Sequence, residues 1–332
     1  MKHHRNGLFA HLACLLATLS CFDLPCTAAA DEAGVSFWLP GQHGSFAAVP
    51  SEPGWSFESS YYHASADDSR GINFQRGGAI QAGTTSPSDL FMFTPTYAFA
   101  TRIFGAQAAF GTTILYGKNA TSVSETPAGS GGNTLSRADE VLGFGDIYPT
   151  ATLKWSKDVH NFMVYATTGI PAGAYQLNRL SALGIGHWAA DGGVGYTYLN
   201  EKAGIEGSVV FGLTYNFINP YTQYQSGTDA HLDWALSPIL TDKFHIGAVG
   251  YIYNQITGDS GLGARLGDFK SRVAGIGPQI GFFIPFFDRE SYLNLRAYSE
   301  FDTRNRLDGL NAFITFSIEA SGQKKPSVAN LR

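Results

Sequence analysis

Apolar and polar residues alternate along most of this chain, and the stretch from Ser291 to Thr303 displays the pattern clearly. One face of this stretch is apolar, through Leu293, Leu295, Ala297 and Phe301. The other face is polar, through Asn294, Arg296, Glu300 and Asp302. A period of two predicts a β-strand with two different faces.

The same alternation predicts eleven further strands, and the run Ile72–Gln81 is a thirteenth candidate. The twelve predicted strands are Trp55–Ala64, Leu90–Thr101, Phe104–Gly117, Gly143–Trp155, Asn161–Gly173, His187–Leu199, Ile205–Phe217, Asp229–Leu240, Phe244–Thr257, Arg272–Phe286, Ser291–Thr303 and Leu310–Ile318.

Short connections between these strands alternate with longer ones, of which Lys118–Leu142 is the longest. Bacterial outer-membrane barrels have short periplasmic turns, longer extracellular loops and an even number of strands. The pattern therefore predicts an all-β fold, a transmembrane antiparallel up-and-down β-barrel of about twelve strands. Ile72–Gln81 would then belong to the first extracellular loop or fold inward. Fourteen strands are the alternative, with part of Asp31–Gly54 supplying another strand.

Composition supports a membrane barrel rather than a soluble sandwich. Only 15% of the residues are charged, 14% are aromatic, and 39 are glycine. Aromatic residues lie near the ends of the apolar strand faces, as an aromatic girdle requires; examples are Trp155, Trp188, Tyr198 and Tyr215. The net charge of -5 gives no reason to expect a nucleic-acid partner.

The first 30 residues have the features of a signal peptide. A basic start is followed by the apolar run Gly7–Phe22 and by the small residues Ala28–Ala30, which predicts cleavage after Ala30. All three cysteines lie in this segment, so the mature chain would have no disulfide, thiol chemistry or cysteine-bound metal. A lipoprotein signal ending at Cys21 is the alternative.

The segment 31–54 contains three prolines and the apolar residues Phe37, Trp38 and Phe46, and it is too apolar for a free tail. It is interpreted either as a strap packed on a rim or as a plug folded into the lumen, where the three aromatic residues would suit a hydrophobic ligand. The barrel is expected at 55–319, followed by a disordered tail at 320–332.

The predicted lumen carries charges of both signs. The candidate lining residues are Asp146, Lys154, Asp191, Glu206, His231, Asp233, Arg296, Glu300 and Asp302. Two interpretations stay open: these groups pair with one another across the lumen, or they form a polar network that narrows a channel and aligns a solute.

Known catalytic motifs are missing from the sequence. The best candidate cluster is His231 with Asp229 and Asp233, which share one strand face, and His187 is a second candidate histidine. The simpler interpretation is a hydrated histidine paired with carboxylates. No enzymatic activity and no cofactor are therefore expected.

Gly275, Gly277 and Gly281 share one strand face. Glycine in a barrel strand permits bending or the close approach of another backbone. We hypothesise that this face receives the N-terminal segment.

Several stretches in the same order resemble the outer-membrane protein family associated with the meta-cleavage pathway of phenol degradation. They include GVSFWLPGQHGSFAAVP, GFGDIYP, NRLSALGIGHWAADGGVGYTYLN and ITGDSGLGARLGDFKSRVAGIGPQIGF, and the resemblance extends from about Gly34 to Ile318. It implies a bacterial outer-membrane barrel and the uptake of hydrophobic or aromatic compounds.

The function expected from the sequence is passive uptake of small hydrophobic or aromatic solutes. The expected partners are these solutes, outer-membrane lipid and lipopolysaccharide, and the barrel-assembly machinery during biogenesis. A membrane-embedded lipid-modifying enzyme that uses His231 or His187, and a surface-binding barrel without transport, are the alternatives.

Overall fold

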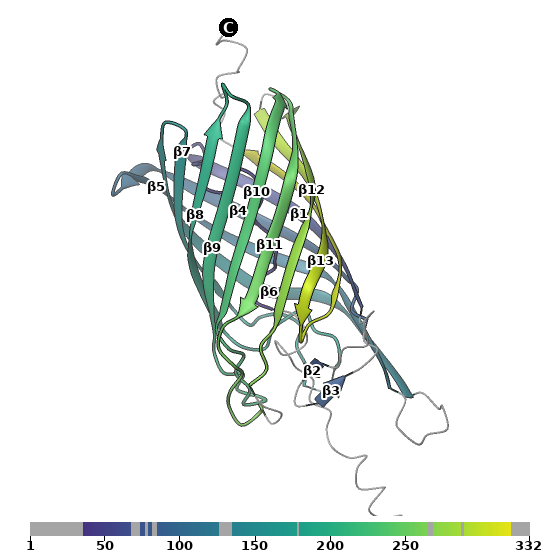
Figure 1. Cartoon of the computed structure of the whole chain (residues 1–332). Coiled ribbons are helices and arrows are strands. Elements are labelled where there is room, and N and C mark those ends of the chain that lie inside the picture. The colour runs from purple at the N-terminus through teal and green to yellow at the C-terminus, as the bar shows by residue number, and fades with distance from the viewer. Residues whose placement is uncertain are drawn as a thin grey trace, which may run out of the picture.

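A computed structural model describes residues 36–67, 74–76, 79–81, 85–125, 135–177, 179–264, 268–286 and 289–319. These residues form a closed β-barrel and a separate two-stranded hairpin (Figure 1). The predicted signal peptide at 1–30 with its cleavage site, and the predicted tail at 320–332, lie outside the described residues.

Twelve strands close the barrel, and every neighbouring pair is antiparallel. They are β1 (Gly54–Asp67), β4 (Ser88–Ile103), β5 (Ala106–Glu125), β6 (Leu135–Lys157), β7 (His160–Gly169), β8 (Ala189–Asn200), β9 (Ile205–Asn216), β10 (Asp229–Thr241), β11 (Phe244–Gln255), β12 (Arg272–Phe286), β13 (Arg289–Arg304) and β14 (Asp308–Glu319). Each strand pairs with the next in this order, and β1 closes the ring by pairing with β14.

This topology confirms the predicted twelve-stranded up-and-down barrel, and the alternative of fourteen strands is wrong. The thirteenth candidate, Ile72–Gln81, supplies the hairpin of β2 (Phe74–Arg76) and β3 (Ala79–Gln81), which pair with each other only. The hairpin lies between β1 and β4 in the chain, at the end of the barrel that carries the longer loops (Figure 1). We assign that end to the extracellular side, because outer-membrane barrels have their longer loops there.

The barrel forms because each strand has two faces of different polarity. In β9, Phe211, Leu213 and Tyr215 are 43–50% exposed and point outward. Val210 and Thr214, on the intervening positions, are at most 1% exposed and point into the lumen. Exposed apolar side chains are stable on the outside only where lipid surrounds them, so this pattern fits a membrane-spanning barrel.

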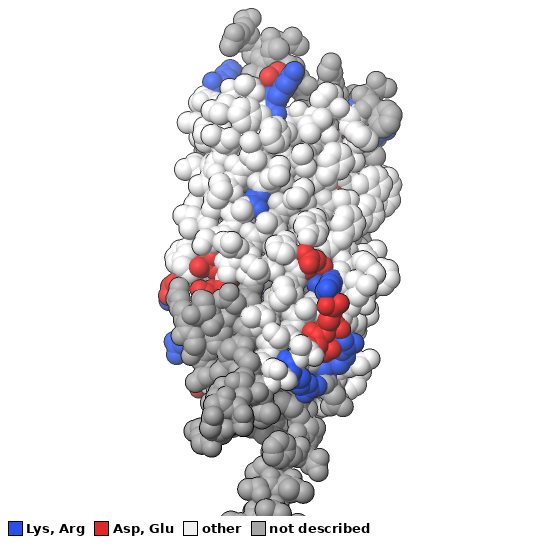
Figure 2. All heavy atoms as spheres, turned by 90° about the vertical axis from the view of Figure 1, so that its right-hand side faces the viewer, with Lys and Arg blue, Asp and Glu red and all other residues white. Residues whose placement is uncertain are grey.

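The outer surface has an apolar band between two charged ends. On the face drawn in Figure 2, acidic and basic side chains gather towards the ends, and the band between them is almost entirely uncharged. Two girdle candidates, Trp188 and Tyr215, are each 50% exposed on the outer surface. In the described part of the chain, no helix has the length and apolarity needed to cross a membrane.

One predicted loop is largely strand. β5 extends to Glu125 and β6 begins at Leu135, and their register continues to the pair Glu125 and Leu135. The interval Lys118–Leu142 was expected to be a loop because its residues are mostly small and polar. Beyond the lipid a hairpin needs no apolar face, since main-chain hydrogen bonds hold its two strands together.

Candidate functional site

The N-terminal segment 36–53 lies inside the barrel and is held there by two buried carboxylates. Asp233 on β10 accepts hydrogen bonds from the backbone N–H groups of Gly41, at 3.0 Å, and His43, at 3.1 Å. Glu206 on β9 accepts one from the backbone N–H of Phe46, at 2.9 Å, and one from the hydroxyl of Ser45, at 2.7 Å. Both carboxylates are at most 1% exposed, so these donors replace the water that their charges would otherwise bind.

Donors from β6 and β13, on either side of β9 and β10 in the barrel, bind the carbonyl groups of the same segment. Arg296 Nη1 lies 3.1 Å from the carbonyl oxygen of Gln42, and Lys154 Nζ lies 3.2 Å from that of Val49. Tyr298 donates its hydroxyl to the carbonyl oxygen of Gly41 at 3.1 Å. Four of the nine residues predicted to line the lumen therefore bind the N-terminal segment: Asp233, Glu206, Arg296 and Lys154.

Two of the predicted lining residues, His231 and Asp191, pair with each other. His231 Nε2 lies 2.8 Å from Asp191 Oδ2, and both side chains are at most 1% exposed. The indole of Trp38 stacks on the imidazole of His231, with ring centroids 3.6 Å apart. Asp233 turns instead to the N-terminal segment, so the suggested cluster of His231 with its own-strand carboxylates is not assembled as such.

The two other aromatic residues of the segment also pack against the barrel wall. Phe37 lies 5.6 Å from Tyr148, measured between ring centroids. Phe46, in a left-handed conformation with φ 66°, makes edge contacts with His245 and Tyr292. These contacts fix the segment against β6 and against β11–β13.

The glycine face of β12 contacts the N-terminal segment through Gln279, whose Nε2 donates to the hydroxyl of Ser45 at 2.7 Å, whereas the atoms nearest to the three glycines belong to neighbouring strands. A Cβ on Gly275 would meet the ring of Tyr251, and one on Gly281 would meet His245. A Cβ on Gly277 would meet the carbonyl of Ala297 on β13. The glycines make room for neighbouring side chains and backbone, and the ring of Tyr251 in turn lies close to Gly41.

The carboxylates of Asp146 and Glu300 bind backbone N–H groups near the extracellular end of the barrel. Asp146 accepts hydrogen bonds at 2.8 Å from the backbone N–H groups of Gly173 and Ile185, both in the loop 170–188. Glu300 accepts the hydroxyl of Tyr251 at 2.7 Å and the backbone N–H of Gly309 at 3.0 Å. Their carboxylates therefore stabilise loop conformations around the extracellular opening.

Asp302 does not face the lumen. Its side chain is 51% exposed and forms an ion pair with Arg272 on the outer surface. The pairing of β12 with β13 shifts register here, and Asp302 has the left-handed φ of 54°. A bulge of this kind interrupts the alternation of faces, so simple counting along the strand fails for this residue.

A cavity of about 1880 Å³ lies beside the N-terminal segment. At the periplasmic end its lining includes the turn residues 201–204 and 241–243. At the extracellular end it includes Asp259 and Arg306. The described part of the lumen therefore contains a passage that reaches both ends of the barrel.

The strand register arranges the wall of this passage in layers. Tyr62 on β1 is the register partner of both Phe313 on β14 and Leu90 on β4, and all three are at most 7% exposed. One layer towards the periplasm, Ser60 is the partner of Thr315 and Met92. The passage therefore has an apolar layer in its extracellular half and more hydroxyl groups on the periplasmic side of that layer.

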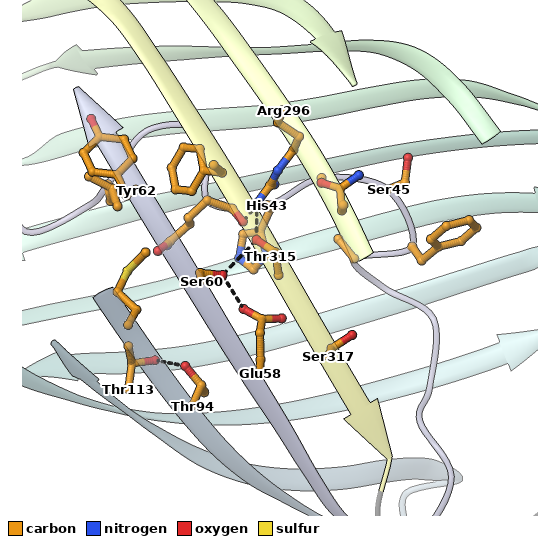
Figure 3. A pocket seen from close by; sticks show the side chains of 18 of the residues that line it. His43, Ser45, Glu58, Ser60, Tyr62, Thr94, Thr113, Arg296, Thr315 and Ser317 are labelled. Atoms are coloured by element: carbon orange, nitrogen blue, oxygen red, sulfur yellow. Dashed lines mark hydrogen bonds between the residues drawn. The ribbon is translucent and has the colours of Figure 1, made fainter. Parts of the chain in front are cut away.

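Hydroxyl pairs and one carboxylate line the passage on the periplasmic side of this layer (Figure 3). Ser60 and Thr315 are 2.8 Å apart, and so are Thr94 and Thr113. Glu58 is the register partner of Thr94 and belongs to the cavity lining. Glu58 is not among the predicted lining residues, although the alternation in β1 places it on the same face as Ser60 and Tyr62.

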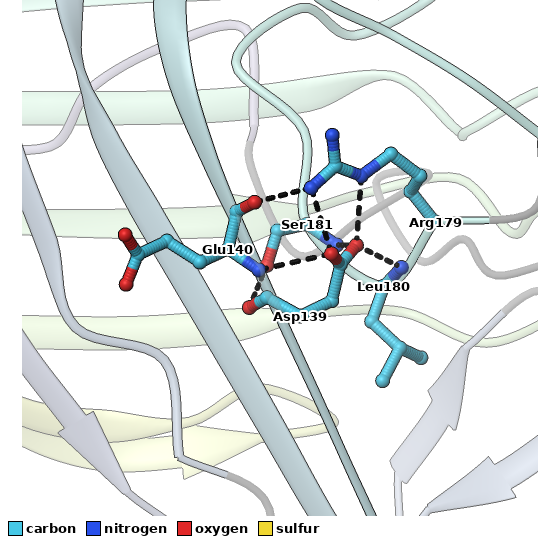
Figure 4. A network of polar contacts seen from close by, with 5 residues as sticks. All are labelled: Asp139, Glu140, Arg179, Leu180 and Ser181. Carbon is cyan, nitrogen blue, oxygen red and sulfur yellow. Dashed lines mark hydrogen bonds and ion pairs between the residues drawn. The ribbon is translucent and has the colours of Figure 1, made fainter.

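The loop 170–188 contributes to the lining of the passage through Ala182 and Leu183, and a network of polar contacts with β6 holds it (Figure 4). Asp139 on β6 accepts hydrogen bonds from Arg179 Nε at 3.0 Å and from the backbone N–H groups of Leu180, at 3.0 Å, and Ser181, at 3.1 Å. The carboxylate raises the pKa of Arg179, so the ion pair stays charged. Leu183, 5% exposed, belongs to the cavity lining.

The inward fold of this loop was not predicted from the sequence. Leu180, Ala182, Leu183 and Ile185 are all buried, and such an apolar run within an extracellular loop is a signal that it folds inward. His187, at the end of the same loop, has its pKa lowered by burial and lies 2.9 Å, through Nδ1, from the carbonyl oxygen of Trp188.

Residues 69–316 match the model of a family described as "Putative MetA-pathway of phenol degradation". The chain belongs to this family. No match was found among the curated proteins. The family and the fold place the chain in the bacterial outer membrane.

A solved outer-membrane channel shares the fold. The outer membrane channel from Pseudomonas putida F1 superposes with a TM-score of 0.64 at 12% identity, covering 81% of this chain and 96% of that one. CymD, a monoaromatic hydrocarbon channel, gives a TM-score of 0.42 at 6% identity, with 82% of this chain and 90% of that one covered.

Proposed function

We propose that this protein is a passive channel for small hydrophobic or aromatic compounds, which pass through the cavity beside the N-terminal segment. The observation that carries the proposal is one cavity of about 1880 Å³ whose lining includes residues at both ends of the barrel. A wall of mixed character supports the choice of solute. Tyr62, Leu90 and Phe313 offer apolar and aromatic surface, to which an aromatic ring binds favourably.

In this proposal the N-terminal segment acts as a partial plug. Carboxylates on β9 and β10 and cations on β6 and β13 hold it, and the passage remains between it and the wall of β1, β4, β5 and β14. A solute would enter past the loop 170–188 and cross the apolar layer formed by Tyr62, Leu90 and Phe313. It would then move along the hydroxyl groups on the periplasmic side of that layer. No step requires energy input, so the direction of flux follows the concentration gradient.

The alternative of a lipid-modifying enzyme receives little support from the histidines. His231 is enclosed by Trp38 and Asp191, and both its side chain and that of Asp191 are at most 1% exposed. A lipid substrate could not reach this imidazole without displacing the N-terminal segment.

Single-channel conductance of the refolded mature protein in a planar bilayer tests the proposal, together with a variant that lacks Asp31–Pro53. The mature protein is expected to conduct weakly, and the variant strongly and without selectivity. Flux of a neutral aromatic compound into protein-containing liposomes, compared with a sugar of similar mass, tests the choice of solute. Equal flux of the two compounds through the intact protein would contradict the proposed preference.

The proposal also includes partners that any protein of this location meets. Outer-membrane lipid and lipopolysaccharide would surround the apolar band, and the barrel-assembly machinery would insert the chain.

A further inference from the structure

Three basic side chains surround a small hollow on the outside of the barrel, at the extracellular ends of β11–β13. The hollow has a volume of about 350 Å³ and is lined by Lys270, Arg272 and Arg304 together with Asp302. None of these four residues belongs to the lining of the passage described above.

The alternation of faces places this hollow on the outer surface. Arg272 is the register partner of Asn254, whereas the adjacent pair, Val273 and Tyr253, is fully buried and points into the barrel. Further towards the middle of the same strands, the outward residues Ile252 and Ile276 are 46% and 49% exposed. The basic side chains therefore lie where the apolar outer band ends.

The charges of the hollow are not balanced within the described part of the chain. Arg272 and Arg304 are direct register partners on neighbouring strands, an arrangement in which like charges repel. Asp302 forms an ion pair with Arg272. Among the described residues, neither Arg304 nor Lys270 forms an ion pair; Lys270 donates to the carbonyl oxygen of Ile256 at 3.1 Å.

The bulge at Asp302 gives the hollow its shape. Regular alternation would turn this carboxylate into the lumen, but the left-handed φ of 54° and the register shift bring it outward beside Arg272. The carboxylate then pairs with the Arg272 guanidinium, and Arg304 and Lys270 line the same hollow. Guanidinium groups match the oxygens of a phosphate in a two-pronged geometry.

We propose that this hollow binds a phosphate group of lipid A. The outward position at the extracellular border of the apolar band selects a lipid-borne phosphate over one that passes through the lumen. The acyl chains of the same molecule would lie along Ile252 and Ile276. Two guanidinium groups and one ammonium group supply the complementary charge, and phosphate binding relieves the repulsion between Arg272 and Arg304.

Native mass spectrometry of the refolded, detergent-solubilised protein titrated with diphosphoryl lipid A tests this site. Arg272→Gln combined with Arg304→Gln is expected to weaken binding by about tenfold or more, since it removes two charge-assisted contacts. Asp302→Asn is expected to preserve or strengthen binding, because it removes the competing negative charge and asparagine tolerates a left-handed φ. Lys118→Gln, on the outer surface away from the hollow, is the matched control and should not change binding.

Comparison of ligands identifies the source of the phosphate. Lipid A without phosphate groups should bind at least about tenfold more weakly than the diphosphoryl form, and inorganic phosphate should compete only at much higher concentration. Equal binding of diphosphoryl and phosphate-free lipid A, or unchanged binding by the folded double variant, would overturn the proposal. Competition by inorganic phosphate at the concentration of the lipid would overturn its assignment to lipid A. If the double variant does not refold, Lys270→Gln is used in its place, and an affinity equal to that of the unchanged protein would equally overturn the site.

Discussion

The indole of Trp38 lies flat on the imidazole of His231, with ring centroids 3.6 Å apart and an angle of 17° between the planes. The two residues are far apart in the sequence, and the contact joins the N-terminal segment to the barrel wall. Nε2 of the same imidazole lies 2.8 Å from Asp191 Oδ2. The stack is therefore part of a rigid support for the segment rather than an open ligand site.

Replacement of Trp38 by alanine should loosen the segment. The substitution removes the stack and opens a cavity at a position that is 2% exposed, which costs about 3 kcal/mol of unfolding free energy. Guanidinium unfolding followed by tryptophan fluorescence measures the loss, and conductance should become larger and noisier. Trp38→Phe keeps a ring on His231 and should retain most of the stability; if both variants were equally stable, the stack would have no structural importance.

Asp233→Ala should release the middle of the N-terminal segment. The change leaves the N–H groups of Gly41 and His43 without their acceptor, and each buried unsatisfied donor costs about 1–3 kcal/mol. Single-channel recordings should then approach those of the protein without Asp31–Pro53. Glu140→Gln, an exposed carboxylate paired with Lys118, serves as control and should leave conductance unchanged. Identical recordings from the Asp233→Ala variant and the original protein would contradict the proposed role of this carboxylate.

Leu90→Asn tests the apolar layer of the passage. The two side chains have similar size, so the passage keeps its width, while its surface becomes less favourable for an aromatic ring by about 1–2 kcal/mol. Flux of a neutral aromatic solute into liposomes should fall several-fold, whereas ion conductance should change little. Phe91→Leu alters the adjacent outward position and should affect neither quantity. A fall in ion conductance equal to the fall in aromatic flux would indicate a blocked passage instead.

Arg179→Ala should free the loop 170–188 at the extracellular opening. The substitution removes the guanidinium that binds the Asp139 carboxylate through Nε and Nη2. Limited proteolysis of the protein in liposomes should then cut this loop earlier than any other described loop. Lys270→Ala, in the loop between β11 and β12, provides the comparison, and equal protection of the loop 170–188 in both variants would argue against the ion pair as its anchor.

Gly277→Ala should impair formation of the barrel. A Cβ at this position would lie 1.8 Å from the carbonyl oxygen of Ala297, so β12 and β13 could not pair as they do. The fraction that refolds, read from the heat-dependent shift in electrophoretic mobility, should fall sharply. Gly143→Ala is the control, because its nearest contact would be a methyl group at 3.8 Å. Normal refolding of Gly277→Ala would require a different pairing of β12 with β13.

The sequence by itself determined the class of fold. Alternation with a period of two, aromatic residues near strand ends and alternating loop lengths predicted twelve antiparallel strands, and these features are local properties of the chain. Asp233, Glu206 and Arg296 keep the parity of their strands, and all three side chains are at most 6% exposed. The limit of this reasoning is visible at Asp302, where a bulge reverses the face of the side chain.

Only the tertiary structure decided which groups the lumenal charges bind. Asp233 and Gly41 are brought together across the barrel, and no spacing along the chain encodes this contact. The same holds for Asp139 and the loop 170–188, and for the hollow formed by β11–β13. Period and composition fix which face a residue occupies, whereas its partner depends on strand register and on the path of irregular segments, which are set by many weak contacts acting together.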